Sequence, residues 1–205
     1  MKIILYSILF FLFANCKHSD KNPNKLTLET LEKTKLTQGW KQYSDKKIRA
    51  LIPSNWTPKV REDILFLVPI DKKLNLYYVA SEYDIERVIS TKNYLQEIFK
   101  QISVDTPTFN YSMSKINFTN GKVCYLLEFD RTENGHNYKF FNVIYPIEKK
   151  IYDFGFNTIN DPKSYAENKR LFYDVLVTLE QNDKKIIASE DFIVQNAKEI
   201  KYEDL

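Results

Sequence analysis

Two Asn-Gly pairs within residues 108–159 constrain the fold of this chain more than any other feature of its sequence. Asn120-Gly121 and Asn134-Gly135 each separate runs of apolar residues, and Asn-Gly strongly favours the two-residue type I′ turn between antiparallel strands. The sequence therefore predicts an antiparallel meander here. Because loop length sets the register of a hairpin, the same turns predict which side chains share a face.

The predicted registers of the two hairpins agree with each other. The first turn predicts the pairs Phe118–Val123 and Ile116–Tyr125. The second predicts the pairs Phe129–Phe140, Tyr125–Ile144 and Asp130–Lys139. Together they place a set of apolar residues on one face, as expected where burial specifies the register. The set is Ile116, Phe118, Val123, Tyr125, Leu127, Phe129, Phe140 and Ile144.

The next connection, residues 147–151, contains no glycine and leaves two registers open. A two-residue loop sends Tyr152, Phe154 and Phe156 to the opposite face, with the odd-numbered residues of 141–145. A longer loop or a bulge sends them to the first face. Both registers leave apolar side chains on both faces, so we expect the sheet to be covered on both sides. The expected fold class is α+β, an antiparallel meander flanked by helices on both faces.

Helical periodicity and capping residues predict two helices. Residues 91–103 carry Leu95, Ile98, Phe99 and Ile102 at i, i+3, i+4 and i+7, with Ser90 or Thr91 as the N-cap. A second helix opens at Asn160 or Asp161, has Pro162 at its first position, and runs to about Glu180. Apolar runs predict strands over 40–43, 47–53, 64–70 and 74–80, and a short helix is expected over 26–36.

The N-terminus has the pattern of an export signal. Lys2 precedes the apolar run Ile3–Ala14, which is too short to span a bilayer and closes on Cys16. Phe13-Ala14-Asn15-Cys16 resembles the lipobox of bacterial lipoproteins, and the resemblance implies that Cys16 is acylated and becomes the first residue of the mature chain. The alternatives are an ordinary signal peptide or an uncleaved N-terminal anchor.

These features divide the chain into four segments. We expect a lipoprotein signal peptide over 1–15, a tether with the short helix over 16–38, one domain over 39–181, and a charged C-terminal tail over 182–205. The tail contains one apolar group, Phe192-Ile193-Val194, which is consistent with either an extra helix or an edge strand.

The order of elements resembles the PsbP-like superfamily, which includes a photosystem II extrinsic subunit, a Ran-binding nuclear import factor and bacterial envelope lipoproteins. The residues that carry the resemblance are Tyr43, Ile48, Leu51–Pro53, Trp56, Gly121–Glu128, Tyr152–Phe156, Tyr165, Phe172 and Leu179. They span roughly Trp40 to Glu180. The resemblance implies an α/β/α sandwich and an accessory or binding role without a shared active site.

Few residues of the chain suggest catalysis. His18 falls in the tether and His136 follows a hairpin turn, so no Ser-His-Asp set is indicated. Glu82, Asp84 and Glu128 are the candidate carboxylates for a hydrolase that works without histidine. No metal or cofactor motif is present, since the four glycines are isolated and the acidic stretch 81–87 lacks the glycine of a calcium loop.

Three further residues are candidates for a binding or structural role. Trp40 and Trp56 form the candidate binding surface, because aromatic residues dominate interface hot spots; packing in the core is the alternative for both. Cys124 lies within the apolar run Val-Cys-Tyr-Leu-Leu, so we expect it to be packed inside a strand.

The sequence therefore predicts a membrane-anchored envelope lipoprotein that acts as a non-catalytic binding or assembly module. Its expected partners are the lipid bilayer, through Cys16, and an envelope protein. Loss of residues 1–15 lowers the formal charge from +3 to +2, which does not suggest nucleic-acid binding. The expected location is the outer membrane, facing the periplasm. The alternatives are an envelope hydrolase and a lipoprotein that binds a small ligand or a toxin.

Overall fold

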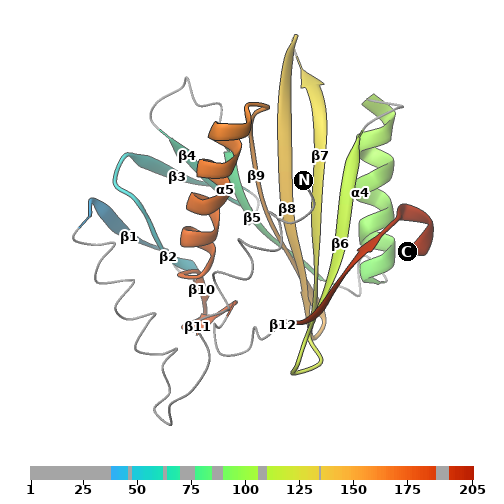
Figure 1. Cartoon of the computed structure of the whole chain (residues 1–205). Coiled ribbons are helices and arrows are strands. Elements are labelled where there is room, and N and C mark those ends of the chain that lie inside the picture. The colour runs from blue at the N-terminus through green and yellow to red at the C-terminus, as the bar shows by residue number, and fades with distance from the viewer. Residues whose placement is uncertain are drawn as a thin grey trace.

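The computed structural model describes residues 38–45, 48–61, 64–69, 77–84, 90–105, 110–133, 135–187 and 194–205. Its main sheet is antiparallel throughout (Figure 1). The strand order is β12 (Val194–Ile200), β6 (Tyr111–Phe118), β7 (Val123–Glu133), β8 (His136–Ile147), β9 (Lys150–Ile159), β5 (Tyr77–Asp84), β4 (Ile64–Pro69) and β3 (Trp56–Arg61). The predicted signal peptide, the tether and the short helix over 26–36 lie outside the described residues.

A smaller antiparallel sheet and two helices complete the described fold. The smaller sheet has the order β1 (Trp40–Ser44), β2 (Ile48–Pro53), β10 (Glu180–Gln181) and β11 (Lys184–Lys185). The helices are α4 (Thr91–Asp105) and α5 (Pro162–Leu176), and a 3-10 turn, η3 (Tyr202–Asp204), ends the chain. Among the described residues, no helix has the length and apolar character needed to cross a membrane.

The hairpin at Gly135 has the predicted register. Phe129 pairs with Phe140, Tyr125 with Ile144, and Asp130 with Lys139. The Phe129 and Phe140 rings stack with their centroids 4.7 Å apart, as expected for directly opposite aromatic residues.

The predicted register of the first hairpin is wrong by one residue. Val123 pairs with Asn117 rather than Phe118, and Cys124 pairs with Ile116. The loop has three residues, because the Gly121 N–H donates to the Phe118 carbonyl at 3.0 Å. Gly121 has a φ of 79°, which suits the left-handed position that follows a type I turn in three-residue hairpins. A shift by one residue moves Ile116 and Phe118 to the other face.

The connection between β8 and β9 follows the two-residue alternative. Ile147 pairs with Lys150, so Glu148 and Lys149 form the loop. Phe141, Val143 and Tyr145 consequently share a face with the aromatic residues at 152, 154 and 156.

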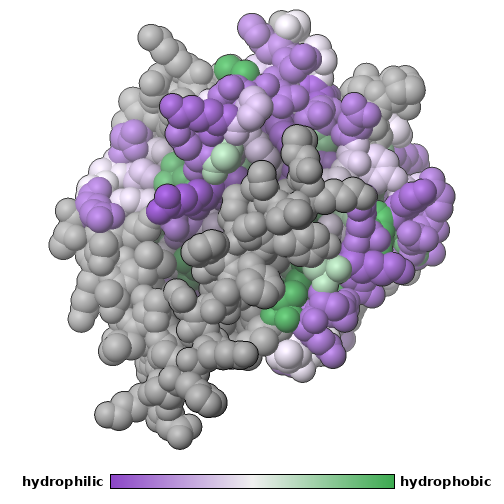
Figure 2. Space-filling view, in the orientation of Figure 1, coloured by the Kyte–Doolittle hydropathy of each residue, from purple (hydrophilic) through white to green (hydrophobic). Residues whose placement is uncertain are grey.

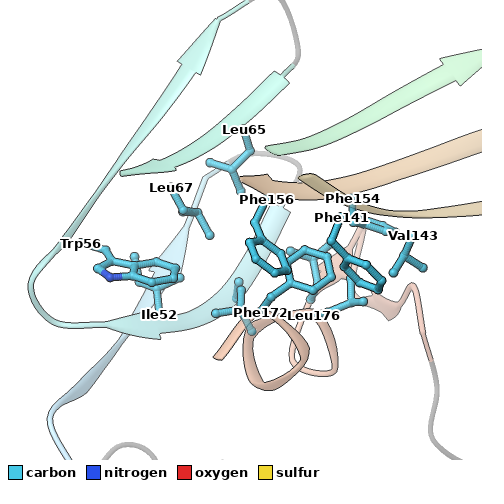
Figure 3. Packing of buried hydrophobic residues seen from close by; sticks show 13 residues of the cluster. Ile52, Trp56, Leu65, Leu67, Phe141, Val143, Phe154, Phe156, Phe172 and Leu176 are labelled. Atoms are coloured by element: carbon cyan, nitrogen blue, oxygen red, sulfur yellow. The ribbon is translucent and has the colours of Figure 1, made fainter. Parts of the chain in front are cut away.

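Two hydrophobic clusters involve the helices and alternate residues of the main sheet. One combines Phe172, Val175 and Leu176 of α5 with Phe141, Val143, Phe154 and Phe156 of the sheet, and we call this side the α5 side (Figure 3). The other combines Leu95, Phe99 and Ile102 of α4 with Leu127, Phe129, Ile144 and Ile151, and we call this side the α4 side. Ile116 and Phe118 join a third cluster with Cys124 and Tyr145, and therefore lie on the α5 side.

Helix α4 begins as predicted, because Ser90 Oγ accepts a hydrogen bond from the Asn93 N–H at 3.1 Å. Asp161 is the N-cap of α5, and its carboxylate accepts from the Ser164 N–H at 2.8 Å. The prediction that this helix continues to about Glu180 is wrong. α5 ends at Leu176, and Thr178 leaves it to accept a hydrogen bond from the Leu51 N–H at 3.0 Å, which joins the helix end to β2.

Two predictions about the extent of the sheets need correction. A strand was predicted over 74–80, but β5 continues through Asp84 because its backbone pairs with β9 up to Lys150. Residues 182–205 were expected to be a charged tail, yet they contribute β11 to the smaller sheet and β12 to the main sheet. Of the two open alternatives for this segment, the edge strand is therefore the one observed, over Val194–Ile200.

Candidate functional site

A buried ion pair lies between α5 and the main sheet. Lys169 stands on the same helix face as Phe172 and is only 8% exposed. Its Nζ donates a short hydrogen bond to Glu128 Oε1 of β7 and lies 4.2 Å from the centroid of the Phe141 ring. Burial lowers the pKa of Lys169, whereas the Glu128 carboxylate opposes this effect. The pair therefore holds a charge in place that would otherwise be costly to bury.

Aromatic and charged side chains surround this pair. The Tyr165 ring centroid lies 5.4 Å from Lys169 Nζ and 5.2 Å from Lys139 Nζ, and Lys139 contacts Asp130 at 3.6 Å. Burial, and then the nearby Glu128 carboxylate, raises the pKa of Tyr165. Burial also raises the pKa of Tyr173. We call this group the Lys169 cluster: Glu128, Asp130, Lys139, Tyr165, Lys169 and Tyr173.

The Lys169 cluster has the chemistry of a structural anchor. A nucleophilic lysine must be neutral and accessible, but Lys169 is held by a carboxylate and covered by α5 and an aromatic ring. Glu128 is likewise engaged, with its side chain 12% exposed. The cluster joins the middle of α5 to β7, and it offers neither partner of the pair to a substrate.

A second buried polar group, the Asp153 cluster, lies on the α4 side. Asp153 of β9 accepts a hydrogen bond from Tyr94 Oη at 2.6 Å and another from Asn142 Nδ2 at 2.9 Å. Burial raises the pKa of Asp153, although these two hydrogen bonds act in the opposite direction. Because Tyr94 belongs to α4, the cluster ties that helix to the sheet.

Gly155 makes room for the Asp153 cluster. It pairs directly with Asn142, and a Cβ placed on Gly155 would lie 2.7 Å from Asn142 Nδ2. Glycine at this position therefore lets the Asn142 amide lie across the β9 backbone and reach Asp153.

The three candidate carboxylates are not brought together. Glu82 and Asp84 lie on β5, opposite Tyr152 and Lys150 of β9, whereas Glu128 lies on β7. β9 and β8 stand between β5 and β7, so three strand spacings give a separation of at least about 14 Å across the sheet. Glu128 is also paired with Lys169. Glu128 therefore does not form an adjacent pair of carboxylates, as acid–base hydrolysis uses, with either residue of β5.

The structure places the two candidate tryptophans differently. Trp56 is 2% exposed and packs beside Ile52 and Leu67 in the core (Figure 3). Trp40 is half-buried at the edge of the smaller sheet and packs against the same cluster. The packing alternative therefore describes Trp56, and Trp40 is the one that keeps exposed surface.

Cys124 and His136 are the remaining candidate residues that the structure describes. Cys124 is buried in β7, as predicted, and burial raises its pKa to about 12. His136 is exposed at the start of β8. Cys16 and His18 lie outside the described residues. Within the described part of the chain, no group of three or more His, Cys, Asp or Glu side chains is arranged to hold a metal ion.

Sequence reasoning missed both polar clusters, although the sequence carries a signal for each. Lys169 falls four residues after Tyr165 and three before Phe172, so a charged residue interrupts the apolar face of the helix. Asp153 stands between Tyr152 and Phe154 in a sheet expected to be covered on both sides, which indicates that its carboxylate is buried and hydrogen-bonded.

No protein-family model and no curated protein matches the sequence. Among solved structures, the chain is similar to PsbP (CyanoP) from Synechocystis sp. PCC 6803, with a TM-score of 0.49, 16% identity, and coverage of 70% of this chain and 92% of that chain. It is also similar to the Saccharomyces cerevisiae Ran-binding protein Mog1p, with a TM-score of 0.47, 9% identity, and coverage of 69% and 94%.

A third similar structure is LpqN, described as involved in cell envelope biogenesis of Mycobacterium tuberculosis, with a TM-score of 0.42, 12% identity, and coverage of 69% and 90%. A Bacteroides thetaiotaomicron crystal structure is matched over only 45% of its own length. PsbP and the Ran-binding protein are the kinds of structure that the sequence resemblance named. At these identities the similarity concerns the fold alone.

Proposed function

We propose that this protein is a lipid-anchored envelope protein whose PsbP-like domain acts by binding another protein, without catalysing a reaction. In this proposal α4 and α5 cover opposite faces of the main sheet, and acylated Cys16 holds the domain at the outer membrane, facing the periplasm. The expected partners are the bilayer, through Cys16, and an envelope protein.

One observation carries the proposal. The buried polar and charged residues of the described chain are Asp153, Thr158, Asn168, Lys169 and Thr178, and all five have hydrogen-bond partners inside the domain. These bonds join α4 or α5 to the sheet, or the end of α5 to β2. Buried polar groups at a catalytic site would instead be directed towards a space for the substrate. Asn157 Oδ1 and Tyr173 Oη, by contrast, are buried without a hydrogen-bond partner among the described residues. A domain in which these five buried polar and charged residues serve its own packing is better suited to act through its surface.

Neither alternative function gains a supporting observation. The hydrolase hypothesis loses Glu128, which is separated from Glu82 and Asp84 by two strands and is paired with Lys169. A small-ligand or toxin-binding site behind Trp56 needs an apolar space there, whereas Ile52 and Leu67 pack against this ring (Figure 3).

Affinity capture tests the binding role. The tagged full-length protein, extracted from membranes in several mild detergents, should co-purify with a stoichiometric protein partner. Leu127→Asp provides the control, because Leu127 is fully buried and a charge there disrupts the fold while Cys16 stays intact. The partner should be absent from this variant. Recovery of no partner in any detergent, or equal recovery with Leu127→Asp, would contradict a role that depends on the folded domain.

A further inference from the structure

One end of the main sheet carries an excess of positive charge. The β6–β7 and β8–β9 turns lie together at the lower end of the sheet in Figure 1, beside the beginning of β12. We call this region the basic end. Lys122, Lys149 and Lys150 lie in or beside the two turns, and Lys115 and Lys198 lie within the adjoining strands, three residues before the end of β6 and four after the start of β12. Glu148 lies in one of the two turns and Asp84 of β5 is directly opposite Lys150, so five lysines stand against two carboxylates. Glu199 follows Lys198 in the sequence, but alternation along the strand directs it to the other side of the sheet.

Two of these lysines face each other on neighbouring strands. Lys115 of β6 pairs directly with Lys198 of β12, and like charges at directly opposite positions of a sheet repel. Lys198 is exposed and Lys115 is half-buried. Within the described residues, neither lysine has a carboxylate partner. The fold therefore keeps a local repulsion that an anionic surface would relieve.

We propose that the basic end docks onto an anionic lipid surface. Clusters of four to eight lysines or arginines are typical of segments that bind acidic phospholipids, and each such residue near the membrane contributes about 1 kcal/mol. The five lysines come from two turns and three strands. A set of charges spread over the end of a sheet suits a flat surface with many negative headgroups better than a single small anion.

This inference rests on the proposed lipid anchor, which keeps the domain close to a bilayer. Residues 17–37 separate Cys16 from the first described residue, and a chain of that length can span at most about 75 Å. A domain of this size is roughly 40 Å across. The anchor alone therefore allows any side of the domain to meet the membrane, and the position of the positive charge selects the basic end.

Vesicle co-sedimentation tests the proposal independently of acylation. The chain from residue 16 onward, carrying Cys16→Ser, is mixed with vesicles of phosphatidylcholine alone or of equimolar phosphatidylcholine and phosphatidylglycerol. We expect binding to the anionic vesicles only, weakening as salt is added because exposed charges are screened. Lys115→Gln with Lys198→Gln should lower the partition coefficient about fivefold per lysine, roughly 30-fold together.

The matched control removes the same charge elsewhere. Lys163→Gln with Lys184→Gln alters two exposed lysines, one at the start of α5 and one in β11, and should change binding by less than about twofold. Equal binding to both vesicle types, or equal loss in the two double variants, would overturn the proposal. Capture of an acidic protein by the basic end, without binding to anionic vesicles, would also overturn it. Since the tested chain has no acyl group, failure of docking is distinguishable from failure of the proposed lipid anchor.

Discussion

Removal of one partner of the Lys169–Glu128 pair should be far more damaging than removal of both. Lys169 is 8% exposed and its ammonium lies over the Phe141 ring, so Glu128→Leu removes the carboxylate from a charge that remains buried. Loss of one partner of a buried ion pair costs about 3–5 kcal/mol, whereas replacement of both by apolar residues of similar size is often neutral or stabilising. We therefore expect Glu128→Leu to lower the free energy of unfolding by about 3–5 kcal/mol, and Glu128→Leu with Lys169→Met to restore most of that loss.

Urea titration followed by tryptophan fluorescence measures these free energies, because Trp56 is buried in the native core. If Glu128→Leu does not fold, Glu128→Gln keeps a hydrogen-bond acceptor and should fall between the wild type and Glu128→Leu. Asp130→Asn is the control, because Asp130 and Lys139 are 36% and 26% exposed and their pair should contribute under about 1 kcal/mol. The reasoning is refuted if the double variant is as unstable as the sum of the two single variants.

Three further predictions concern other parts of the fold. Burial raises the pKa of Asp153 above its ordinary value of 3.8, so the folded state binds this proton more tightly than the unfolded state does. The stability that Asp153 contributes is therefore present at low pH and is lost as the pH rises through the folded-state pKa. Urea midpoints measured across that range should fall less steeply with pH in Asp153→Asn than in the wild type, and parallel profiles would count against this assignment. Gly155→Ala should cost about 1–3 kcal/mol in the same titration, because its Cβ would lie 2.7 Å from Asn142 Nδ2; an unchanged midpoint would show that the amide can move aside freely. Cys124, with its pKa raised to about 12, should react with a disulfide reagent at neutral pH only after unfolding in urea, and rapid labelling of the native Cys16→Ser protein would contradict its burial.

The two Asn-Gly turns show how far sequence reasoning extends for this fold. The hairpin at Gly135 has the predicted register because β7 and β8 keep apolar residues on the α4 side along their length, among them Leu127, Phe129 and Ile144. Strand β6 behaves differently. Its first half is apolar on the α4 side, at Met113, and its second half on the α5 side, at Ile116 and Phe118. Since the apolar side changes within β6, its pattern could not select between a two-residue and a three-residue loop.

Short elements and tertiary contacts account for most of what the sequence did not predict. β10 and β11 have two residues each, which is too short for an alternating pattern, and β10 is recognisable through its pairing with β2 and β11. The Lys169 and Asp153 clusters join residues far apart in the chain, so the sequence can show that these charges must be neutralised but cannot name Glu128, Tyr94 or Asn142 as their partners. The sequence likewise could not show whether the hydrolase candidates Glu82, Asp84 and Glu128 lie together, because their spacing depends on how strands far apart in the chain are ordered in the sheet.

Mass spectrometry of the mature N-terminus tests the central claim most directly. We predict that the protein extracted from membranes begins at Cys16 and that its N-terminal peptide carries the added mass of fatty acyl chains. An unmodified Cys16 peptide from the membrane-bound protein, or a mature chain that begins at another residue and is released into the medium, would contradict the account.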